Sequence, residues 1–217
     1  MAETQTPPPR AGAGFLVDLF RNRPWAKRAI SVLSVVLLIG GVAMLAYPFA
    51  TNLYQHRLQD KLSKQLASPL LKQKYRNKSL SVGDSLTRIK MPAINVDVVV
   101  VEGTTPTALR AGAGHYAQTP LPCEKGNVAI AGHRTTYGKP FADIDQLRVG
   151  DQIELDTPVG GCVYELKKPP FVVDKADLSV LNPTTDQTLT LTSCHPKGSA
   201  AKRIIVKAVW VKDLRGA

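Results

Sequence analysis

Cysteine is scarce in this sequence, with three residues in a chain of 217. So few cysteines cannot build the dense disulfide framework that holds many small secreted domains together. The chain is 44% hydrophobic and 21% charged, a balance typical of folded proteins and not of disordered ones. The composition therefore predicts a domain of ordinary size with its own hydrophobic core.

Acidic residues are also few, with 17 Asp and Glu against 28 Lys and Arg, which gives a net charge of +11. The excess is local: residues 51–90 hold nine basic and two acidic side chains, whereas residues 91–217 hold fourteen and thirteen. A nucleic-acid-binding domain carries its positive charge on the folded part, so this pattern argues against nucleic acid as a partner. Basic segments that flank an apolar run instead suit the anionic headgroups of membrane lipids.

Long apolar runs are absent except for one, over residues 29–50, which contains no charged side chain. A helix of that length spans about 33 Å at ~1.5 Å per residue, enough to cross the hydrocarbon core of a membrane. The run is longer than the ~7–15-residue core of a signal peptide and starts behind a polar leader. We therefore predict an uncleaved transmembrane helix at 29–50, preceded by a disordered cytoplasmic leader over residues 1–28.

After this run the chain changes character twice. Leu58, Leu62 and Leu66 recur at every fourth position, which predicts a short juxtamembrane helix that Pro69 ends. Residues 70–85 are polar and basic and are interpreted as a solvated linker, so that residues 51–85 together form a juxtamembrane helix and basic linker.

Short alternating runs separated by turn residues begin at about Leu86 and predict strands. The candidates are LTRIKMP, INVDVVVVEG, NVAIAGHR, DQIELDT, CVYELKK, FVVDKAD, TLTLTSC and RIIVKAVWVK. TALRAG and FADIDQL are interpreted as short helical turns. This pattern predicts an all-β domain with short helices over residues 86–217, built as a closed barrel or a sandwich.

Three polar residues stand at the ends of predicted strands. Cys194 closes TLTLTSC, His133 follows Gly132 in NVAIAGHR, and Arg203 opens the last run. A thiol becomes a good nucleophile beside an imidazole, and a permanent cation can stabilise an oxyanion. Each residue alone has a plain explanation, as a buried cysteine, a surface histidine or a solvated arginine. Pairing of the last two runs would bring Arg203 back to Cys194.

The residues from Thr190 to Cys194 resemble the sortase signature Thr-Leu-x-Thr-Cys, with Ser193 in place of the second threonine. Gly-His-Arg at 132–134 is similar to the region around the catalytic histidine of that family, and Arg203 follows Cys194 at the family's spacing. The resemblance covers residues 86–212. It implies an eight-stranded sortase-type β-barrel in which Cys194 is the nucleophile, His133 its proton partner and Arg203 the oxyanion-side cation. It implies no cofactor and no metal.

GHYAQTPLP, AGHRTTYGKPF and SCHPKGSAAKR resemble class E sortases of high-GC Gram-positive bacteria. This implies an extracellular enzyme on a single-pass anchor with a cytoplasmic N-terminus. It would cleave LAxTG or LPxTG sorting signals of exported proteins between Thr and Gly and transfer them to a cell-wall precursor (lipid II) amine. Tyr116 holds the position associated with alanine as second residue of the signal, although a packed tyrosine is the plain alternative. His115, Ala131 and Thr192 are the other candidate substrate-binding residues.

Several alternatives stay open. A pilus-polymerising sortase often has an extra lid segment, and none is obvious between Lys64 and Leu86. An L,D-transpeptidase places its cysteine after a glycine, which is absent here, and a non-catalytic surface binding module would form no thioester. His195 is expected on the opposite face of the strand from Cys194. The two other cysteines, at positions 123 and 162, form a disulfide only if the fold brings them together.

Overall fold

The computed structural model describes residues 24–214, without the side chains of residue 26 and residues 47–53. Most of the leader expected over residues 1–28 therefore lies outside the described residues. The chain divides into two compact units, residues 1–50 and residues 51–217.

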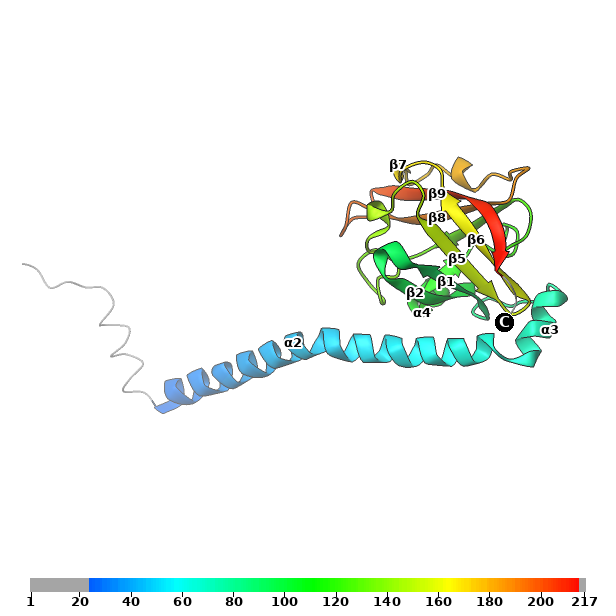
Figure 1. Ribbon diagram of the computed structural model, residues 1–217. Coiled ribbons are helices and arrows are strands. Elements are labelled where there is room, and N and C mark those ends of the chain that lie inside the picture. Colours follow the sequence, from blue (N-terminus) through cyan, green and yellow to red (C-terminus); the bar gives the residue numbers. More distant parts are fainter. Residues whose placement is uncertain (1–23, 215–217) are drawn as a thin grey trace, which may run out of the picture. The chain divides into compact units, whose positions relative to one another are not determined.

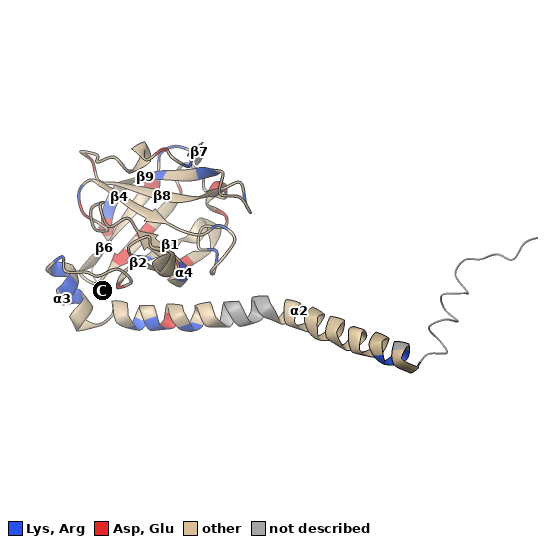
Figure 2. Ribbon diagram, turned by 180° about the vertical axis from the view of Figure 1, so that it is seen from behind, with Lys and Arg blue, Asp and Glu red and all other residues tan. Residues whose placement is uncertain are grey.

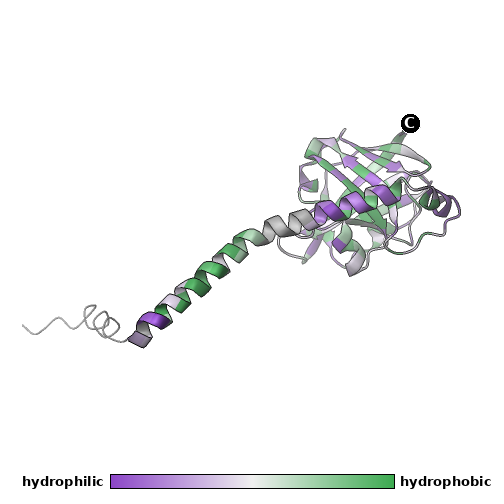
Figure 3. Ribbon diagram, turned by 90° about the horizontal axis from the view of Figure 1, so that it is seen from below, coloured by the Kyte–Doolittle hydropathy of each residue, from purple (hydrophilic) through white to green (hydrophobic). Residues whose placement is uncertain are grey.

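The first unit contains the beginning of the long helix α2 (Pro24–Leu66). Between Lys27 and Ala46 this helix is long and apolar enough to cross a membrane, and none of that window is buried in the protein. Figure 3 shows this part of the helix in the green of hydrophobic residues. The segment is a candidate membrane span, close to the one predicted over residues 29–50.

The second unit is built around one β-sheet (Figure 1). Its strands are β1 (Ser85–Met91), β2 (Val96–Glu102), β3 (Ala113–His115), β4 (Asn127–Ala131), β5 (Gln152–Thr157), β6 (Gly160–Leu166), β7 (Phe171–Asp174), β8 (Thr188–His195) and β9 (Lys202–Leu214). Its short helices are α3 (Pro69–Arg76), η1 (Pro92–Ile94), α4 (Pro106–Ala111), η2 (Ile144–Gln146) and η3 (Ser179–Leu181).

The sheet closes into a barrel. Eight strands follow one another in the order β6-β5-β1-β2-β3-β4-β8-β9, and β9 pairs back with β6. The ninth strand, β7, pairs only with the first part of β9, which leaves it outside the ring. The eight-stranded barrel predicted from the sequence is confirmed. The sequence patterns missed β3, because its three residues, Ala-Gly-His, are too few to show an alternation.

The barrel interior explains which strand residues face outward. Leu189 and Leu191 of β8 and Val128 and Ile130 of β4 belong to the main core cluster. Because successive side chains of a strand point to opposite faces, the residues between them point away from the core. On β8 these outward residues include Thr192 and, at the end of the strand, Cys194.

The residues that follow the candidate span pack on the barrel as a helix. Leu62 is buried against Val99 and Val101 of β2, and the carbonyl of Leu62 accepts a hydrogen bond from Ser85 Oγ at 2.9 Å. Figure 2 colours the Lys and Arg positions of this helix blue along the edge away from the barrel, and Arg57, Lys61 and Lys64 are exposed. The leucine pattern of the sequence thus marks the face that packs on β2.

The linker expected over residues 70–85 is not a solvated spacer. Helix α3 begins after Ser68, whose side chain accepts a hydrogen bond from the backbone N–H of Leu71, and both Leu71 and Tyr75 are buried. The Tyr75 hydroxyl donates to the carbonyl of Pro122 at 2.8 Å. The two buried residues are spaced i, i+4 among basic residues, which made the helix look polar.

Cys123 and Cys162 form a disulfide bond, with their Cα atoms 5.7 Å apart. The bond joins the connection between β3 and β4 to strand β6. The structure thereby answers the question that the sequence left open.

Candidate active site

Strands β4 and β8 are neighbours and run parallel, so their ends meet at the same edge of the barrel. Ala131 pairs with Thr192, and the ladder continues past β4: Gly132 N–H donates to the carbonyl of Thr192 at 3.0 Å. Ser193 Oγ then donates to the carbonyl of Gly132 at 2.7 Å. His133 and Cys194 each follow the Ala131–Thr192 pair by two residues, so this register brings them to the same edge.

The third residue reaches this edge from the other side of β8. Strands β8 and β9 are antiparallel, and Cys194 pairs directly with Arg203. Directly opposed residues project their side chains to the same face of a sheet. The Arg203 guanidinium donates through Nη1 to the carbonyls of Ala200 and Lys202, at 3.1 and 3.0 Å. The pairing expected between the last two predicted strands is therefore present.

A glycine is needed before His133. A Cβ atom on Gly132 would lie 2.5 Å from the ring of Phe141, which is fully buried. The backbone N–H of Phe141 also donates to the carbonyl of His133 at 3.1 Å. The chain turns back on itself here, and the Phe141 ring fills the space that any larger residue at position 132 would need.

His133 lies in a half-buried setting beside an aromatic ring. Its imidazole is 5.1 Å from the Tyr137 ring, centroid to centroid, with the planes tilted by 48°. Burial lowers the pKa of His133 below its usual 6.5. The neutral imidazole, which accepts a proton, is therefore the main form at pH 7. Sequence patterns gave no role to Tyr137, since a lone loop tyrosine carries no signal.

Three of the four candidate substrate-binding residues come together on the outer face of the barrel. The Tyr116 hydroxyl and Thr192 Oγ1 are hydrogen-bonded at 3.0 Å, and Thr192 pairs with Ala131. Thr192 precedes Cys194 by two residues, which is about 7 Å along a strand. This patch therefore adjoins the free, half-buried thiol of Cys194.

His115 is placed differently from our expectation that it lines the substrate-binding face. Its side chain is fully buried; Nδ1 lies 2.9 Å from Glu102 Oε2, and Nε2 lies 2.9 Å from the carbonyl of Pro120. Strand β3 is enclosed between β2 and β4, and His115 pairs with Glu102. Contacts with Glu102 and Pro120 account for this burial, which the position of His115 beside Tyr116 does not reveal, and a role of His115 in substrate binding stays a prediction.

Arg134 was quoted from the sequence only as part of a motif, yet it is a buried residue beside the site. Its side chain is only 2% exposed and bonds with Asp145 Oδ1 at 2.7 Å. Its Nη1 approaches the carbonyl of Cys194 at 3.4 Å and Nδ1 of His195 at 3.5 Å. The signal that pointed to this residue is its position directly after His133.

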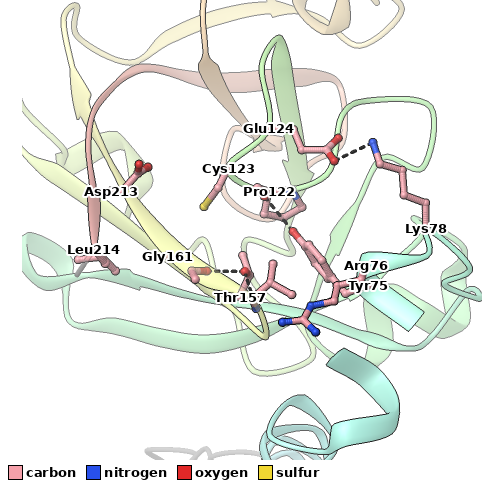
Figure 4. A pocket seen from close by; sticks show the side chains of 12 residues that line it. Tyr75, Arg76, Lys78, Pro122, Cys123, Glu124, Thr157, Gly161, Asp213 and Leu214 are labelled. Atoms are coloured by element: carbon pink, nitrogen blue, oxygen red, sulfur yellow. Dashed lines mark hydrogen bonds and ion pairs between the residues drawn. The ribbon is translucent and has the colours of Figure 1, made fainter. Parts of the chain in front are cut away.

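A hollow of about 510 Å³ lies elsewhere on the second unit (Figure 4). Tyr75, Cys123 and Thr157 are among its lining residues, and none of Cys194, His133 and Arg203 is. Lys78 and Glu124 form an ion pair at its rim, 2.7 Å apart. Among residues 24–214, no group of three or more His, Cys, Asp and Glu side chains is arranged to hold a metal ion.

Comparisons with known proteins agree on one family. A family model described as "Sortase domain" matches residues 89–211. The chain is 30% identical to "Sortase SrtE1" of Streptomyces coelicolor over 207 residues, which are 87% of this chain and 58% of that protein. It is 36% identical to "Sortase D" of Bacillus subtilis over 122 residues, 54% of this chain and 60% of that protein. The chain thus spans about three fifths of the length of these two relatives.

Solved structures give the same result. The "Sortase D5 transpeptidase" of Clostridium perfringens superposes with a TM-score of 0.63 at 31% identity, covering 73% of this chain and 98% of that one. Sortase E from Streptomyces avermitilis superposes with a TM-score of 0.57 at 32% identity, covering 62% and 92%.

Proposed function

Because the chain belongs to the sortase family, we propose that it is a membrane-anchored cysteine transpeptidase that moves exported proteins from their sorting signals onto a cell-wall amine. The observation that carries this proposal is the meeting of three strand ends. The registers of β4, β8 and β9 bring His133, Cys194 and Arg203 to one edge of the barrel. These are a base just after β4, a nucleophile on β8 and a permanent cation on β9.

In the first half-reaction, His133 holds the proton of the Cys194 thiol, and the Cys194 thiolate attacks the threonine carbonyl carbon of the signal. The carbonyl π electrons move onto oxygen, and the Arg203 guanidinium stabilises that oxyanion. When the intermediate collapses, the C–N bond to glycine breaks and His133 gives its proton to the leaving amine. The product is a thioester between the threonine residue and Cys194.

In the second half-reaction, an amine of the acceptor attacks the thioester carbon, and neutral His133 takes its proton. The C–S bond breaks, and the thiolate of Cys194 leaves. The net change exchanges one amide bond for another and needs no cofactor. A lipid II peptide amine is the proposed acceptor, and a lysine of a pilin subunit is the alternative that a polymerising enzyme would use.

Tyr116 is proposed to favour alanine as the second residue of the signal, giving LAxTG over LPxTG. Its hydroxyl is held by Thr192 Oγ1 at 3.0 Å, so the ring has a fixed direction on the face beside Cys194. If the tyrosine donates to Thr192, its oxygen still has a lone pair for the backbone N–H of alanine. Proline has no such N–H.

The proposed topology has a cytoplasmic N-terminus, one span and an extracellular catalytic domain. The candidate span at Lys27–Ala46 and the location of sorting substrates outside the cell support it. Basic residues on both sides of the span suit contact with anionic lipid headgroups.

The test uses the full chain in detergent micelles with two fluorogenic peptides, one LAxTG and one LPxTG. Each is incubated with and without an amine acceptor, beside Cys194→Ala and Tyr116→Phe variants. We expect Cys194-dependent cleavage, a product joined to the acceptor, and a preference for LAxTG that Tyr116→Phe weakens. Cleavage that survives in Cys194→Ala would refute the proposed nucleophile. No cleavage of either peptide by folded protein would favour the binding-module alternative, and an unchanged preference in Tyr116→Phe would remove the role of the hydroxyl.

A further inference from the structure

Arg134 is an unusual residue because its charge is buried. The side chain is 2% exposed, although taking a guanidinium out of water costs several kcal/mol unless its donors are satisfied. Four contacts satisfy them: Nε donates to the carbonyl of Ala142 at 3.0 Å, Nη2 bonds with Asp145 Oδ1 at 2.7 Å, and Nη1 reaches the Cys194 carbonyl and His195 Nδ1. All three guanidinium nitrogens of Arg134 therefore have a partner within the protein.

These contacts join two parts of the chain that carry the proposed chemistry. Ala142 and Asp145 belong to the segment that returns toward the barrel after His133, where Phe141 N–H holds the His133 carbonyl. Cys194 and His195 are the last residues of β8. A second link runs between the same parts, because Lys197 Nζ and Asp143 Oδ1 are 2.6 Å apart. Both side chains of the second link are exposed, which makes it weak, whereas the Arg134 guanidinium is buried although its partner Asp145 is 42% exposed.

Main-chain pairing alone does not fix this edge. The last β4–β8 contacts are those of Gly132 with Thr192 and Ser193, so no strand ladder ties the residues after Gly132 to β8. Arg134 is the next residue after His133, and it supplies a contact to Cys194 itself. A planar guanidinium with several fixed donors holds such a junction more rigidly than a single ammonium does.

We propose that Arg134 is a positioning residue for the transpeptidation: its buried guanidinium fixes the Cys194 end of β8 against the segment that carries His133. This inference depends on the proposed function, since it concerns the geometry between nucleophile and base. Arg134 touches the backbone carbonyl of Cys194 and does not itself contact the reacting atoms.

The same contact assigns a role to His195. Nη1 of Arg134 can only donate, and it approaches Nδ1 of His195 at 3.5 Å. His195 is thereby held as part of the junction on the opposite face from the Cys194 side chain, as the strand alternation predicted.

The test compares kcat and KM of the full chain in detergent micelles for wild type, Arg134→Met, Arg134→Lys and Asp145→Asn. Rates are normalised to the thiols that form a thioester, so that loss of folded protein does not count as loss of rate. We expect Arg134→Met to lower kcat roughly 100-fold with KM changed less than about threefold, as for a misplacement of about 1 Å. Arg134→Lys should recover part of that loss, and Asp145→Asn should show a smaller loss of kcat.

Arg148→Met is the matched control, because Arg148 is an exposed arginine in the same part of the chain. It should keep wild-type kcat. A further variant, Arg134→Ala, leaves a space of the size of the missing guanidinium group. Added guanidinium ion should raise the kcat of this variant and leave that of Arg148→Met unchanged, which a purely structural role would not predict. The proposal would be overturned if Arg134→Met kept the wild-type kcat after normalisation. If Arg134→Met does not fold, wild-type kcat in both Arg134→Lys and Asp145→Asn would overturn it. Absence of Cys194-dependent transfer in the wild type would instead refute the proposed function.

Discussion

At the scale of single residues, burial sets the protonation state of the candidate base. His133 is half-buried, and its pKa lies below the usual 6.5 for that reason. Under the proposed mechanism, a neutral imidazole at pH 7 favours the half-reaction in which His133 takes a proton from the acceptor amine. The half-reaction in which it gives a proton to glycine uses the minor, protonated form.

The lowered pKa of His133 predicts the pH dependence of the second half-reaction. Aminolysis of a preformed thioester, measured with a weakly basic amine such as hydroxylamine, should lose rate only below pH 6.5, where His133 becomes protonated. Thioester formation needs one proton on the Cys194–His133 pair, so its rate should also fall in acid, where both groups are protonated and the thiolate is lost. Rapid-quench mass measurement of the acyl-enzyme separates the two rates. An aminolysis rate that declines already between pH 8 and 7 would contradict the neutral imidazole.

A second residue-scale prediction concerns Lys207 of β9. Burial, together with the charge of Lys168, lowers the pKa of Lys207 from 10.5 to about 8, while its Nζ donates to the Val180 carbonyl. Between pH 8 and 10.5 the unfolded chain binds the extra proton, so this residue makes stability rise with pH in that window. Lys207→Met should therefore gain most in melting temperature below pH 8, and the gain should shrink toward pH 10.

Lys212→Met supplies the comparison for that measurement, because Lys212 is an exposed lysine on the same strand. Its effect on melting temperature should be small and nearly constant with pH. A constant effect of Lys207→Met between pH 7 and pH 10 would mean that its charge costs nothing in the folded protein.

At the scale of elements, strand ends determine the site. The parallel β4–β8 pair and the antiparallel β8–β9 pair together bring three segments to one edge. Gly132 lets the chain leave β4 close under the Phe141 ring, so its substitution tests how tightly this turn fixes His133.

Gly132→Ala is expected to reduce transpeptidation strongly, because a Cβ 2.5 Å from the Phe141 ring forces one of them to move. The cost of such overpacking is typically about 1–3 kcal/mol of stability, so the barrel should still fold. Melting temperature and kcat are measured on the same sample. Gly198→Ala is the control, since open space surrounds that glycine although its φ of 84° adds local strain. Unchanged kcat in Gly132→Ala would show that the turn is not required for activity.

Sequence patterns predicted the strands better than they predicted which side chains would contact one another. The long strands were found because alternation records which face is buried, and β3 was missed because three residues carry no period. The Cys194–Arg203 pairing followed from two neighbouring strands with a short connection. The burial of His115 and the four partners of Arg134 depend on how loops fold back onto the strands. The partners lie 5 to 61 residues away with no regular spacing, so no periodic pattern encodes them.

At the scale of the whole molecule, the barrel domain begins earlier in the chain than the sequence patterns suggested. Leu62, Leu71 and Tyr75 are all buried, although they precede the first strand. Each fully buried side chain of this kind contributes about 1.5–3 kcal/mol. The second unit begins at residue 51, consistent with these contacts.

Truncation tests this boundary. A chain starting at Thr51 should melt cooperatively and well above one starting at Leu80, which lacks all three side chains and leaves Val99 and Val101 exposed. Calorimetry of both chains gives the difference directly. Equal melting temperatures would show that the two helices add nothing to the stability of the barrel.

The disulfide between Cys123 and Cys162 also has a consequence for when the protein matures. Such bonds persist in oxidising compartments and are rare in the reducing cytosol. Under the proposed topology, the crosslink therefore closes only after the domain has been translocated. It lies in the connection between the strand that ends at His115 and the strand that leads to His133, so the enzyme would complete its fold on the side of the membrane where its substrates are. Molecules that stay inside the cell would lack this bond, and the ratio of crosslinked to reduced chain would report how much enzyme has been exported.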